Sequence, residues 1–581
     1  MRSRILCVTL YLTLGALGQA EEASPSLLGK VLQAYGGRAR LESLRSLKML
    51  QGPVKKVGDT IIWRRDSDAR IEFIGPSSVD TTILTDTHAL FVNREGDEIY
   101  LEPAAAQSLR VAMFLTSLPF QLPMLLTLDI TETSSDAERP ALAFTLAGAR
   151  VHLSVDPATW LVESATAQPP THPGGTNGRS RATGGEGKEG GRYISVAYQQ
   201  HREKDGISFP LHQMWGKEPY AVSLATTILL PNSKVGDALF SESGTLEISG
   251  GAPRVTTPIH LHPDQFLSVT VTLGDRGRHD FVFDTGASET SMDMRFARSL
   301  SLTGVPHKNI TTQYGVVESE LVKFPSASMG GVTFNNYLWE IMPLSQLDVR
   351  TGIIGAGLLQ AGPCEINFVE TLLTIHQPDA FRPPAGAIPL TLQFRQHCPF
   401  ITMSVNETLT ADLLVDTGAV DGIQIRLLDP FFAGGRVKRE EFKGLRLSRT
   451  SLPLAAGVIQ ISRGQYGGPG TQGLVGLKFF RDRFTRIIFD RSRHLLWVVP
   501  KALLGISFSG SSLKLAKLSE LQKSDLRVDD LLTHLDGQPV TTGQEVRTIL
   551  AQRRPDETVK CTVQRNGEAV EIPVRLLPAF E

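Results

Sequence analysis

Two aspartates in this sequence are candidates for acid-base chemistry, because each follows a run of apolar residues and precedes a tight turn. Asp284 stands in FVFDTGAS and Asp416 in LLVDTGAV, so each acid is followed by Thr-Gly-Ala. Two carboxylates brought together in a desolvated site cannot both ionise, so the pair shares one proton. It then supplies one general acid and one general base. Which aspartate holds the proton stays open, since such a pair titrates as a unit.

The surroundings of the two acids are also repeated. In each half a strand hairpin precedes the acid, and an apolar element ending in glycine follows it, with Gly355 in IIGAGLL and Gly476 in GLVGLKFF. At typical residue usage, one Asp-Thr-Gly arises by chance in a chain of this length with a probability of about 0.1. Two in matching surroundings are far less probable. The sequence therefore indicates a duplicated unit.

This repeated pattern resembles the signature of aspartic proteases, in the compact retropepsin-like form duplicated within one chain. The resemblance implies a pseudo-dimer in which Asp284 and Asp416 form the catalytic dyad, with no cofactor and no metal. It also implies support by Thr285 and Thr417 through crossed hydrogen bonds, by Gly286 and Gly418 through tight turns, and by Gly355 and Gly476 on the strands behind the loops.

Aspartic proteases also need a hairpin that closes over the bound peptide and excludes water. The candidates for its tip are Tyr314 and Gly315 in TTQYGVVES, and Gly444 in FKGLRLS. An ordinary surface turn remains the alternative for Tyr314. Alanine follows the glycine of each acid motif, as in retropepsins, and this resemblance implies a working range that extends towards neutral pH.

Residues 500–581 resemble a PDZ domain, chiefly in VDDLL followed by DGQPV. The resemblance implies a groove at Leu504, Gly505, Ile506 and Phe508 that takes a C-terminal peptide as an added strand. The groove could equally hold the protein's own terminus or serve only for packing. The segment SSLKLAKLSELQKS is expected to be helical.

The segment before the acid motifs begins with helices and continues as strands. SPSLLGKVLQAYGG has helical spacing, and from about Ile61 the apolar period changes to two, which predicts antiparallel strands in meander order, interrupted by an apolar helix in AAAQSLRVAMFLTSL. The pattern resembles the LolA/LolB-like open β-barrel, in YGG and DGISFPLHQMW. The resemblance implies a lipid or lipoprotein ligand, while an inert support or a substrate-gathering domain stays open.

Length and composition predict a mainly β protein of several domains. The 581 residues include 41% hydrophobic and 20% charged residues, which is ordinary for globular protein. The predicted order is a signal peptide (1–20), a LolA/LolB-like half-barrel domain (21–248) with a disordered insertion (169–192), two aspartic protease lobes (249–384 and 385–499) and a PDZ domain (500–581).

The first residues have the features of a secretory signal. Arg2 and Arg4 precede an apolar run that is too short to span a membrane, and Gly18-Gln19-Ala20 fits a cleavage site. A secreted protein, periplasmic or associated with the cell envelope of a bacterium, is expected. With 59 basic and 60 acidic residues the net charge is -1, which argues against nucleic acid as a partner.

Three cysteines follow the signal, at Cys364, Cys398 and Cys561. An odd number cannot form a complete disulfide framework, and three buried thiols are the preferred interpretation, although pairing of Cys364 with Cys398 stays open. Two functions are therefore carried forward. The first is a secreted aspartic endopeptidase that acts on polypeptides. The second is a non-catalytic lipid-, lipoprotein- or peptide-binding protein with a degenerate protease core.

Overall fold

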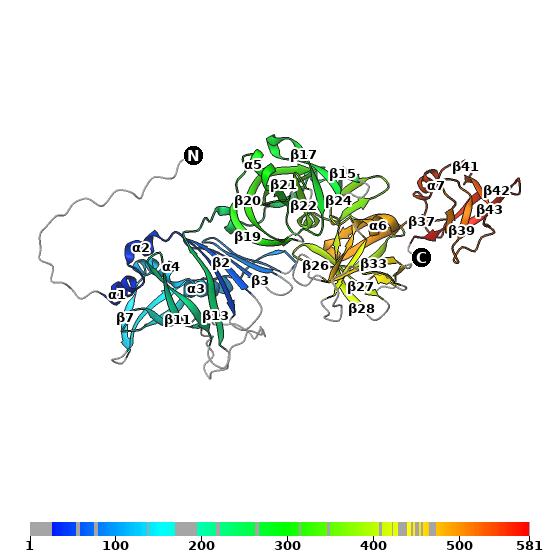
Figure 1. Cartoon of the computed structure of the whole chain (residues 1–581). Helices are drawn as coiled ribbons and strands as arrows, with labels where there is room; N and C mark the ends of the chain where they lie inside the picture. Colours follow the sequence, from blue (N-terminus) through cyan, green and yellow to red (C-terminus); the bar gives the residue numbers. More distant parts are fainter. Residues whose placement is uncertain are drawn as a thin grey trace, which may run out of the picture. The chain divides into compact units, whose positions relative to one another are not determined.

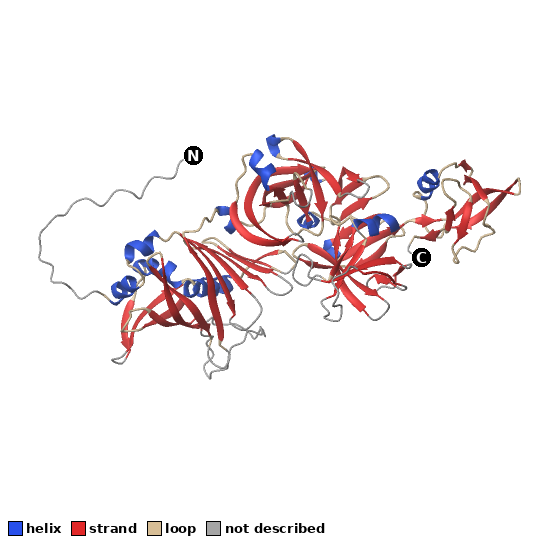
Figure 2. Ribbon diagram, viewed as in Figure 1, coloured by secondary structure: helices blue, strands red, loops and turns tan. Residues whose placement is uncertain are grey.

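The computed structural model shows a mainly β molecule, as the sequence predicted (Figure 1, Figure 2). The predicted signal peptide and the predicted insertion lie outside the described residues. These are 26–53, 59–74, 79–93, 95–135, 139–168, 194–216, 221–261, 266–312, 315–344, 349–405, 409–420, 422–427, 438–442, 445–447, 452–454, 457–463 and 472–579.

The chain forms two compact units, each built from two stretches of sequence. The first unit contains residues 1–44 and 107–226, and the second contains residues 45–106 and 227–581. The predicted domain boundaries do not follow this division, because residues 45–106 group with the acid motifs and not with the rest of the N-terminal segment. Six strands of the predicted half-barrel, β1–β6, therefore belong to the second unit.

The first unit is an antiparallel meander with helices, in the sheet order β13-β12-β11-β10-β9-β8-β7. Its elements are α1 (Leu27–Ala34), α2 (Arg38–Ser43), most of α3 (Pro103–Thr116), α4 (Leu118–Gln121), η1 (Leu122–Thr127), β7 (Thr131–Ser135), β8 (Arg139–Leu146), β9 (Ala149–Val155), β10 (Val162–Gln168), β11 (Ile194–Lys204), β12 (Ile207–Trp215) and the first half of β13 (Val222–Pro231).

Side chains of the sheet bind the end of α3. Tyr198 donates its hydroxyl to the carbonyl oxygen of Leu115 at 2.8 Å, and Gln213 donates its amide to that of Thr116 at 2.8 Å. The last carbonyl groups of a helix have no partner within the helix, so these bonds fix its C-terminus on the sheet. Gly36 has a φ of 117°, and an added Cβ there would lie 2.2 Å from the carbonyl oxygen of Gly206, which explains a glycine after Tyr35.

Among the described residues, no single helix is long and apolar enough to cross a membrane, whereas the pair Pro103–Thr116 and Leu118–Thr127, bent by 107°, passes the test of length and composition.

The second unit begins with strands that pair as β6-β5-β4-β3-β2-β1-β13. Their side chains join an apolar cluster that includes Trp63, Ile83 and Leu90 together with Leu321 of β20 and Leu338 of β21. These strands therefore pack on the lobe that contains the first acid motif. Their bounds are β1 (Ser46–Pro53), β2 (Asp59–Arg65), β3 (Asp68–Ile74), β4 (Val79–Leu84), β5 (Ala89–Val92) and β6 (Glu98–Tyr100), and η2 (Asp237–Phe240) joins the same cluster.

The first of two lobes surrounds β17, the strand that ends at the first acid. Strand β14, which the sequence assigned to the N-terminal domain, pairs with β21 and so belongs to this lobe. The elements are β14 (Thr245–Ile248), η3 (Ser249–Gly251), β15 (Arg254–Leu261), β16 (Leu267–Thr272), η4 (Gly274–Arg276), β17 (Arg278–Asp284), β18 (Ser291–Asp293), α5 (Met294–Ser299), β19 (Val305–Thr312), β20 (Gly315–Met329), β21 (Val332–Met342), β22 (Gly352–Gly355), η6 (Ala356–Gln360), β23 (Cys364–Asn367) and β24 (Leu372–His376).

The second lobe repeats the arrangement around β28. In each lobe the acid-bearing strand lies parallel to a short Gly-ended strand, β22 or β34, and that strand pairs antiparallel with β18 or β29. The elements are β25 (Ile388–Thr391), β26 (Gln393–Arg395), β27 (Cys398–Val405), β28 (Leu409–Asp416), β29 (Ile423–Leu427), β30 (Lys438–Phe442), β31 (Leu445–Leu447), β32 (Leu452–Leu454), β33 (Gly457–Arg463), β34 (Gly473–Gly476), α6 (Leu477–Arg483), β35 (Phe484–Asp490), η7 (Arg491–Arg493) and β36 (Leu495–Pro500).

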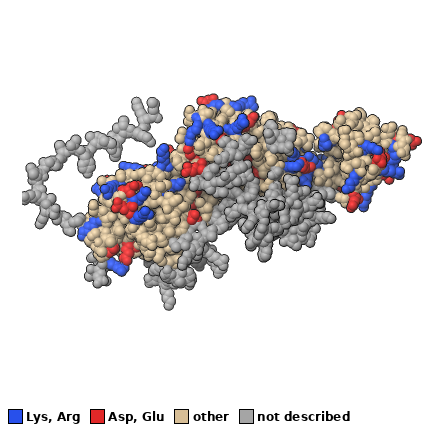
Figure 3. All heavy atoms as spheres, in the orientation of Figure 1, with Lys and Arg blue, Asp and Glu red and all other residues tan. Residues whose placement is uncertain are grey.

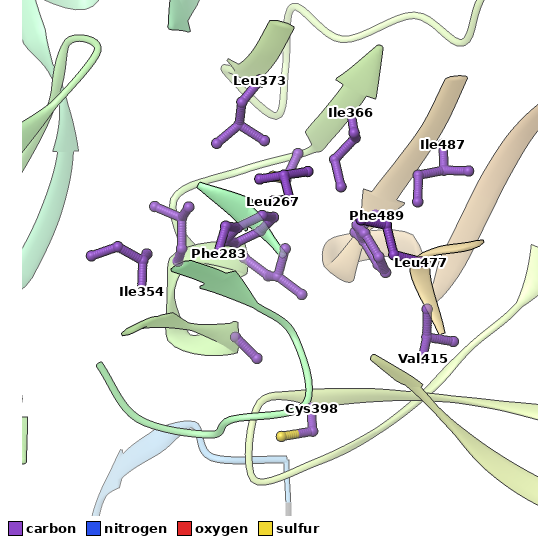
Figure 4. Packing of buried hydrophobic residues seen from close by; sticks show 14 of the residues in the cluster. Leu267, Phe283, Ile354, Ile366, Leu373, Cys398, Val415, Leu477, Ile487 and Phe489 are labelled. Atoms are coloured by element: carbon purple, nitrogen blue, oxygen red, sulfur yellow. The ribbon is translucent and has the colours of Figure 1, made fainter. Parts of the chain in front are cut away.

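The two lobes share one sheet and one core. Strand β23 of the first lobe pairs antiparallel with β35 of the second, with Ile366 opposite Ile487. Buried residues of both lobes form a single cluster, in which Phe283 and Val415 lie directly before the two acids (Figure 4). The core therefore fixes the two acid-bearing strands relative to each other.

The C-terminal segment has its own apolar core, made only of residues between Ala502 and Leu576. Its elements are β37 (Ala502–Leu503), β38 (Ile506–Phe508), β39 (Leu515–Leu518), β40 (Leu531–Leu535), β41 (Gln538–Pro539), α7 (Gly543–Leu550), β42 (Thr558–Arg565), β43 (Glu568–Arg575) and β44 (Leu577–Pro578).

The expected helix in SSLKLAKLSELQKS is wrong. Leu513 and Leu515 are buried while Lys514 between them is exposed, which is the alternation of a strand. The segment forms β39 and pairs with β38.

Candidate active site

Each candidate acid is the last residue of a buried strand. Asp284 ends β17 and lies opposite Gly355 of β22, and Asp416 ends β28 and lies opposite Gly476 of β34. The last residue of each strand lies at the end of the buried core, so its carboxyl group can face away from it. The structure thus places both predicted supporting glycines beside the acids.

Crossed hydrogen bonds lock the two acid loops together. The Thr285 hydroxyl donates to the carbonyl oxygen of Val415 at 2.6 Å and accepts the N–H of Thr417 at 3.1 Å. The Thr417 hydroxyl donates to the carbonyl oxygen of Phe283 at 2.8 Å and accepts the N–H of Thr285 at 3.0 Å. Both threonines are buried, so these groups have no access to water. The loops, 132 residues apart in sequence, therefore hold each other in register.

The glycines after the threonines allow the loops to touch. An added Cβ on Gly286 would lie 2.6 Å from Cγ of Asp416, and one on Gly418 would lie 2.3 Å from Cγ of Asp284. Neither distance is tolerated by a real Cβ, and the atoms it would meet belong to the opposite acid. Glycine is required at both positions because each acid packs against the other loop.

The two carboxyl groups are hydrogen-bonded to each other, and each residue is only partly buried. Burial raises the pKa of Asp284, and burial together with the charge of Asp284 raises the pKa of Asp416 well above its ordinary value. The N–H of Gly286 donates to Asp284 at 2.7 Å and that of Ala419 donates to Asp416 at 2.9 Å, which favours an ionised partner. A dyad with one proton accounts for both the raised pKa values and the N–H donors, because one aspartate is protonated and the other is ionised.

A buried thiol supports the first acid loop from behind. Cys398 Sγ lies 3.6 Å from the carbonyl oxygen of Gly286. Burial and the neighbouring carboxyl groups raise the pKa of this thiol, so it stays protonated and unreactive. Cys364 and Cys561 are also unpaired and buried, as the sequence predicted, and Cys364 does not bond to Cys398.

The predicted flap residues fall at the edge of the described chain. Tyr314 lies outside the described residues. Gly315 begins β20, opposite Thr312 at the end of β19, so β19 and β20 form a hairpin that turns at the predicted place. Gly444 also lies outside the described residues. The strands on either side of it, β30 and β31, pair with β33 and β32 and not with each other. The place of Gly444 at a hairpin tip therefore stays a prediction.

The predicted PDZ groove residues lie on one loop and one strand. Leu504 is buried, and Gly505 has a φ of 68°. Ile506 and Phe508 lie on β38, whose one partner among the described strands is β39. The other edge of β38 therefore remains available for an added strand.

Neither a metal nor a single-sign surface is evident in the described part of the chain. No group of three His, Cys, Asp or Glu residues there could hold a metal ion. On the face in Figure 3, basic and acidic side chains both spread over the described surface.

Sequence reasoning missed the contacts of strands β1–β6 with the protease lobes. His307 lies 2.9 Å from Glu72, a residue 235 positions away, and Arg491 lies 2.6 Å from Asp97. Periodicity identifies the strands that carry these residues but gives no signal for which strands of different segments meet.

Family models match two parts of the chain. Residues 269–358 match the model described as aspartyl protease, and residues 502–576 match the PDZ domain model. These matches confirm the two resemblances that the sequence predicted. No curated protein matches the chain.

Three solved structures illustrate the similarity in fold. A retropepsin-like aspartic protease from Rickettsia conorii is 17% identical over 23% of this chain and 94% of its own, with a TM-score of 0.17. A LolA superfamily protein from Nitrosomonas europaea is 10% identical over 36% and 96%, with a TM-score of 0.23. Basic 7S globulin from soybean is 10% identical over 42% and 94%, with a TM-score of 0.26. At these values the likenesses carry no argument about function.

Proposed function

We propose that this protein is an aspartic endopeptidase that hydrolyses peptide bonds through the Asp284 and Asp416 dyad and an activated water. One observation carries the proposal: two hydrogen-bonded carboxyl groups, each partly exposed, lie at the ends of strands that two equivalent lobes hold together. A degenerate core would have no need for crossed threonines and paired glycines that preserve this contact.

The dyad would act as one acid and one base. The ionised aspartate takes a proton from a water molecule, whose oxygen attacks the carbonyl carbon of the scissile bond. The protonated aspartate donates its proton to the carbonyl oxygen, which gives a gem-diol without a covalent adduct. When this intermediate collapses, the C–N bond breaks, the protonated aspartate gives its proton to the leaving amine, and the ionised aspartate takes a proton from a gem-diol hydroxyl. The dyad then returns to its singly protonated state.

The remaining parts of the chain fit an enzyme that acts on polypeptides outside the cytoplasm. The open edge of β38 supports recognition of a C-terminal peptide by strand addition. The N-terminal sequence supports secretion to the periplasm or cell envelope. The N-terminal meander, with its LolA/LolB-like sequence pattern, is proposed to bind a lipid or lipoprotein.

The test is a peptide-library digest with the full chain and its Asp284→Asn variant. Asparagine keeps the shape of the side chain but cannot share the proton, so cleavage should fall by at least about 1,000-fold. A statine-type transition-state analogue should inhibit the wild type.

Asp280→Asn is the matched control, because Asp280 is an exposed acid on the same strand that pairs with Thr270. Its activity should stay within about twofold of wild type. Cleavage retained by folded Asp284→Asn would overturn the proposal. A wild-type protein that binds peptide or acyl ligands yet cleaves nothing from acidic to neutral pH would favour the binding protein.

A further inference from the structure

A cluster of buried charged side chains joins the predicted flap hairpin to strand β3. His307 of β19 is 3% exposed, Glu72 of β3 is 2% exposed and Glu340 of β21 is 3% exposed. Nε2 of His307 lies 2.9 Å from Oε1 of Glu72, and Nδ1 lies 3.4 Å from Oε1 of Glu340. All three residues belong to the second unit, so the imidazole bridges two carboxyl groups within one compact body.

A bulge in the hairpin directs His307 towards this cluster. Pro306 lies opposite Glu320 and Asn309 lies opposite Glu318, so two residues of β19 face the single residue between those partners on β20. Such β-bulges change the direction of a side chain and are common next to active sites. His307 is one of the two residues of this bulge, and it points inward to the buried cluster.

The hydrogen bond of the bridge joins His307 to Glu72. Nε2 of His307 lies 2.9 Å from Glu72, whereas Nδ1 faces Glu340 at 3.4 Å and makes no hydrogen bond. Nε of Arg70 donates to Glu72 at 2.8 Å, and the Arg70 residue is 9% exposed. Glu72 is therefore held between the guanidinium of Arg70 and the imidazole of His307 in a buried cluster.

Further groups surround the bridge. Nζ of Lys48 donates to the carbonyl oxygen of His307 at 3.4 Å, and the His307 ring lies 5.8 Å from that of Trp63. An apolar cluster around Trp63, with Leu321 of β20 and Leu338 of β21, seals the same contact. The charged groups that face the bridge or line the small cavity beside it are Lys48, Arg70, Glu98, Glu289, Glu318 and His397.

The bridge is close in the fold to the first acid loop. The N–H of Glu340 donates to the carbonyl oxygen of Thr290 at 2.9 Å, and Glu340 lies opposite Ser291 in the parallel pairing of β21 with β18. Thr290 is at the far end of the loop that starts at Asp284, and its hydroxyl accepts the N–H of Gly355 at 3.4 Å. The bridge thus connects β3, the base of the hairpin and the strand beside the acid loop.

We propose that His307 is a positioning residue that fastens the base of the β19–β20 hairpin to strands β1–β6 and thereby sets the affinity for peptide substrates. The inference rests on the proposed endopeptidase function. It makes β1–β6 part of the substrate-binding apparatus and not a separate support. Loss of the bridge loosens the hairpin and raises KM. The acids themselves are held by the crossed threonines, so kcat changes little.

The kinetic test uses the full chain with His307→Gln, Glu72→Gln and both together. Each single variant should raise KM about tenfold and keep kcat within about threefold. The double variant should be no worse than either single one, because all three lose the same bridge. His376→Gln is the matched control, since Nε2 of His376 lies 3.1 Å from Glu365 in the sheet that joins the lobes. Its KM should stay within about twofold.

A second readout does not depend on hydrolysis. In an Asp284→Asn background, His307→Gln should speed hydrogen exchange of peptides from residues 305–329 by about tenfold or more, while His376→Gln should leave them unchanged. Unchanged exchange and unchanged KM would overturn the inference, as would effects of the two single variants that simply add. If His307→Gln does not fold, Glu72→Gln alone carries both measurements. Absent hydrolysis in wild type would refute the proposed function, and the exchange result would still decide the role of His307.

Discussion

Each acid of the dyad touches the glycine of the opposite loop, so neither loop can adopt its geometry alone. A Cβ added to Gly286 would lie 2.6 Å from Cγ of Asp416, and a Cβ added to Gly418 would lie 2.3 Å from Cγ of Asp284. The backbone of Gly418 has no positive φ, so its conformation would not exclude another residue. The requirement is purely one of space, and this makes it testable by the smallest possible substitution.

Gly418→Ala should abolish most activity while leaving the fold intact. The new methyl group would displace Asp284, and a misplacement of about 1 Å at a reacting group costs about 100-fold in rate. Gly422→Ala is the control, because an added Cβ there meets nothing within 4 Å. Peptide cleavage and thermal unfolding are measured on both. Equal activities of the two variants would contradict the proposed contact.

Asp416→Asn should make the folded protein more stable at neutral pH. The folded-state pKa of Asp416 is raised, so the native state binds more protons than the unfolded state above the ordinary aspartate pKa of 3.8. The contribution of Asp416 to stability is therefore full below about pH 4 and is lost as pH rises through the raised value. Denaturant unfolding at acidic and neutral pH measures this. If Asp416→Asn is less stable than wild type at neutral pH, the predicted direction of the change in unfolding free energy is wrong.

At the scale of elements, the turn between β26 and β27 is unusual because two non-glycine residues have positive φ. Gln396 has a φ of 48° and His397 of 68°, and Arg395 pairs with Cys398 across the turn. The N–H of His397 donates to the carbonyl oxygen of Glu95 at 2.8 Å. This contact with the β5–β6 connection accounts for a conformation that usually favours Asn and Gly.

Burial lowers the pKa of His397 to about 4, with Arg491 adding to the effect. A histidine that is neutral when folded supports stability fully above its ordinary pKa of 6.5 and loses that support as pH falls towards 4. The loss over this window is about 3 kcal/mol. His397→Gln should remove this slope from the plot of unfolding free energy against pH. If the His397→Gln variant keeps the slope of wild type, other titrating groups cause the pH dependence of stability.

Elements with a clear apolar period could be predicted from the sequence. The strands of the N-terminal meander and of both lobes have period-two patterns, and α3 has an apolar helical run. The 511–524 segment was mistaken for a helix because its leucines also fit a helical spacing, and only the pairing with β38 decides for a strand. Gly444 lies outside the described residues, so its place at a hairpin tip stays a prediction.

The acid site could be predicted because its residues are contiguous in sequence. Asp284, Thr285 and Gly286 lie in one loop, and a second copy confirms that the pattern is not accidental. The bridge at His307 could not be predicted, because its partners are single polar residues in distant strands. No local pattern marks a histidine that a bulge turns inward.

At the scale of the whole molecule, the PDZ segment differs from the lobes in having a core of its own. Its cluster contains no residue outside 502–576. A fragment of residues 500–581 should therefore fold alone and unfold in one cooperative transition. Burial raises the pKa of Cys561 to about 12, so its thiol should react with a disulfide reagent only on unfolding. A fragment whose thiol reacts at once in buffer would contradict an independent core.

The two lobes share one buried cluster and the β23–β35 pairing, so we expect them to unfold together as one cooperative unit, separate from the PDZ segment. Calorimetry of the full chain should show them melting together. Separate transitions for residues 249–384 and 385–499 would contradict the common core.

The covalent link between the two acid-bearing strands has a kinetic consequence. An enzyme assembled from two identical subunits loses its centre on dilution, because each subunit supplies half of it. In this chain both halves are tethered, so specific activity should be independent of enzyme concentration down to the nanomolar range and below. Dilution of the full chain should therefore leave the acid pair intact, because both halves of the site belong to one polypeptide.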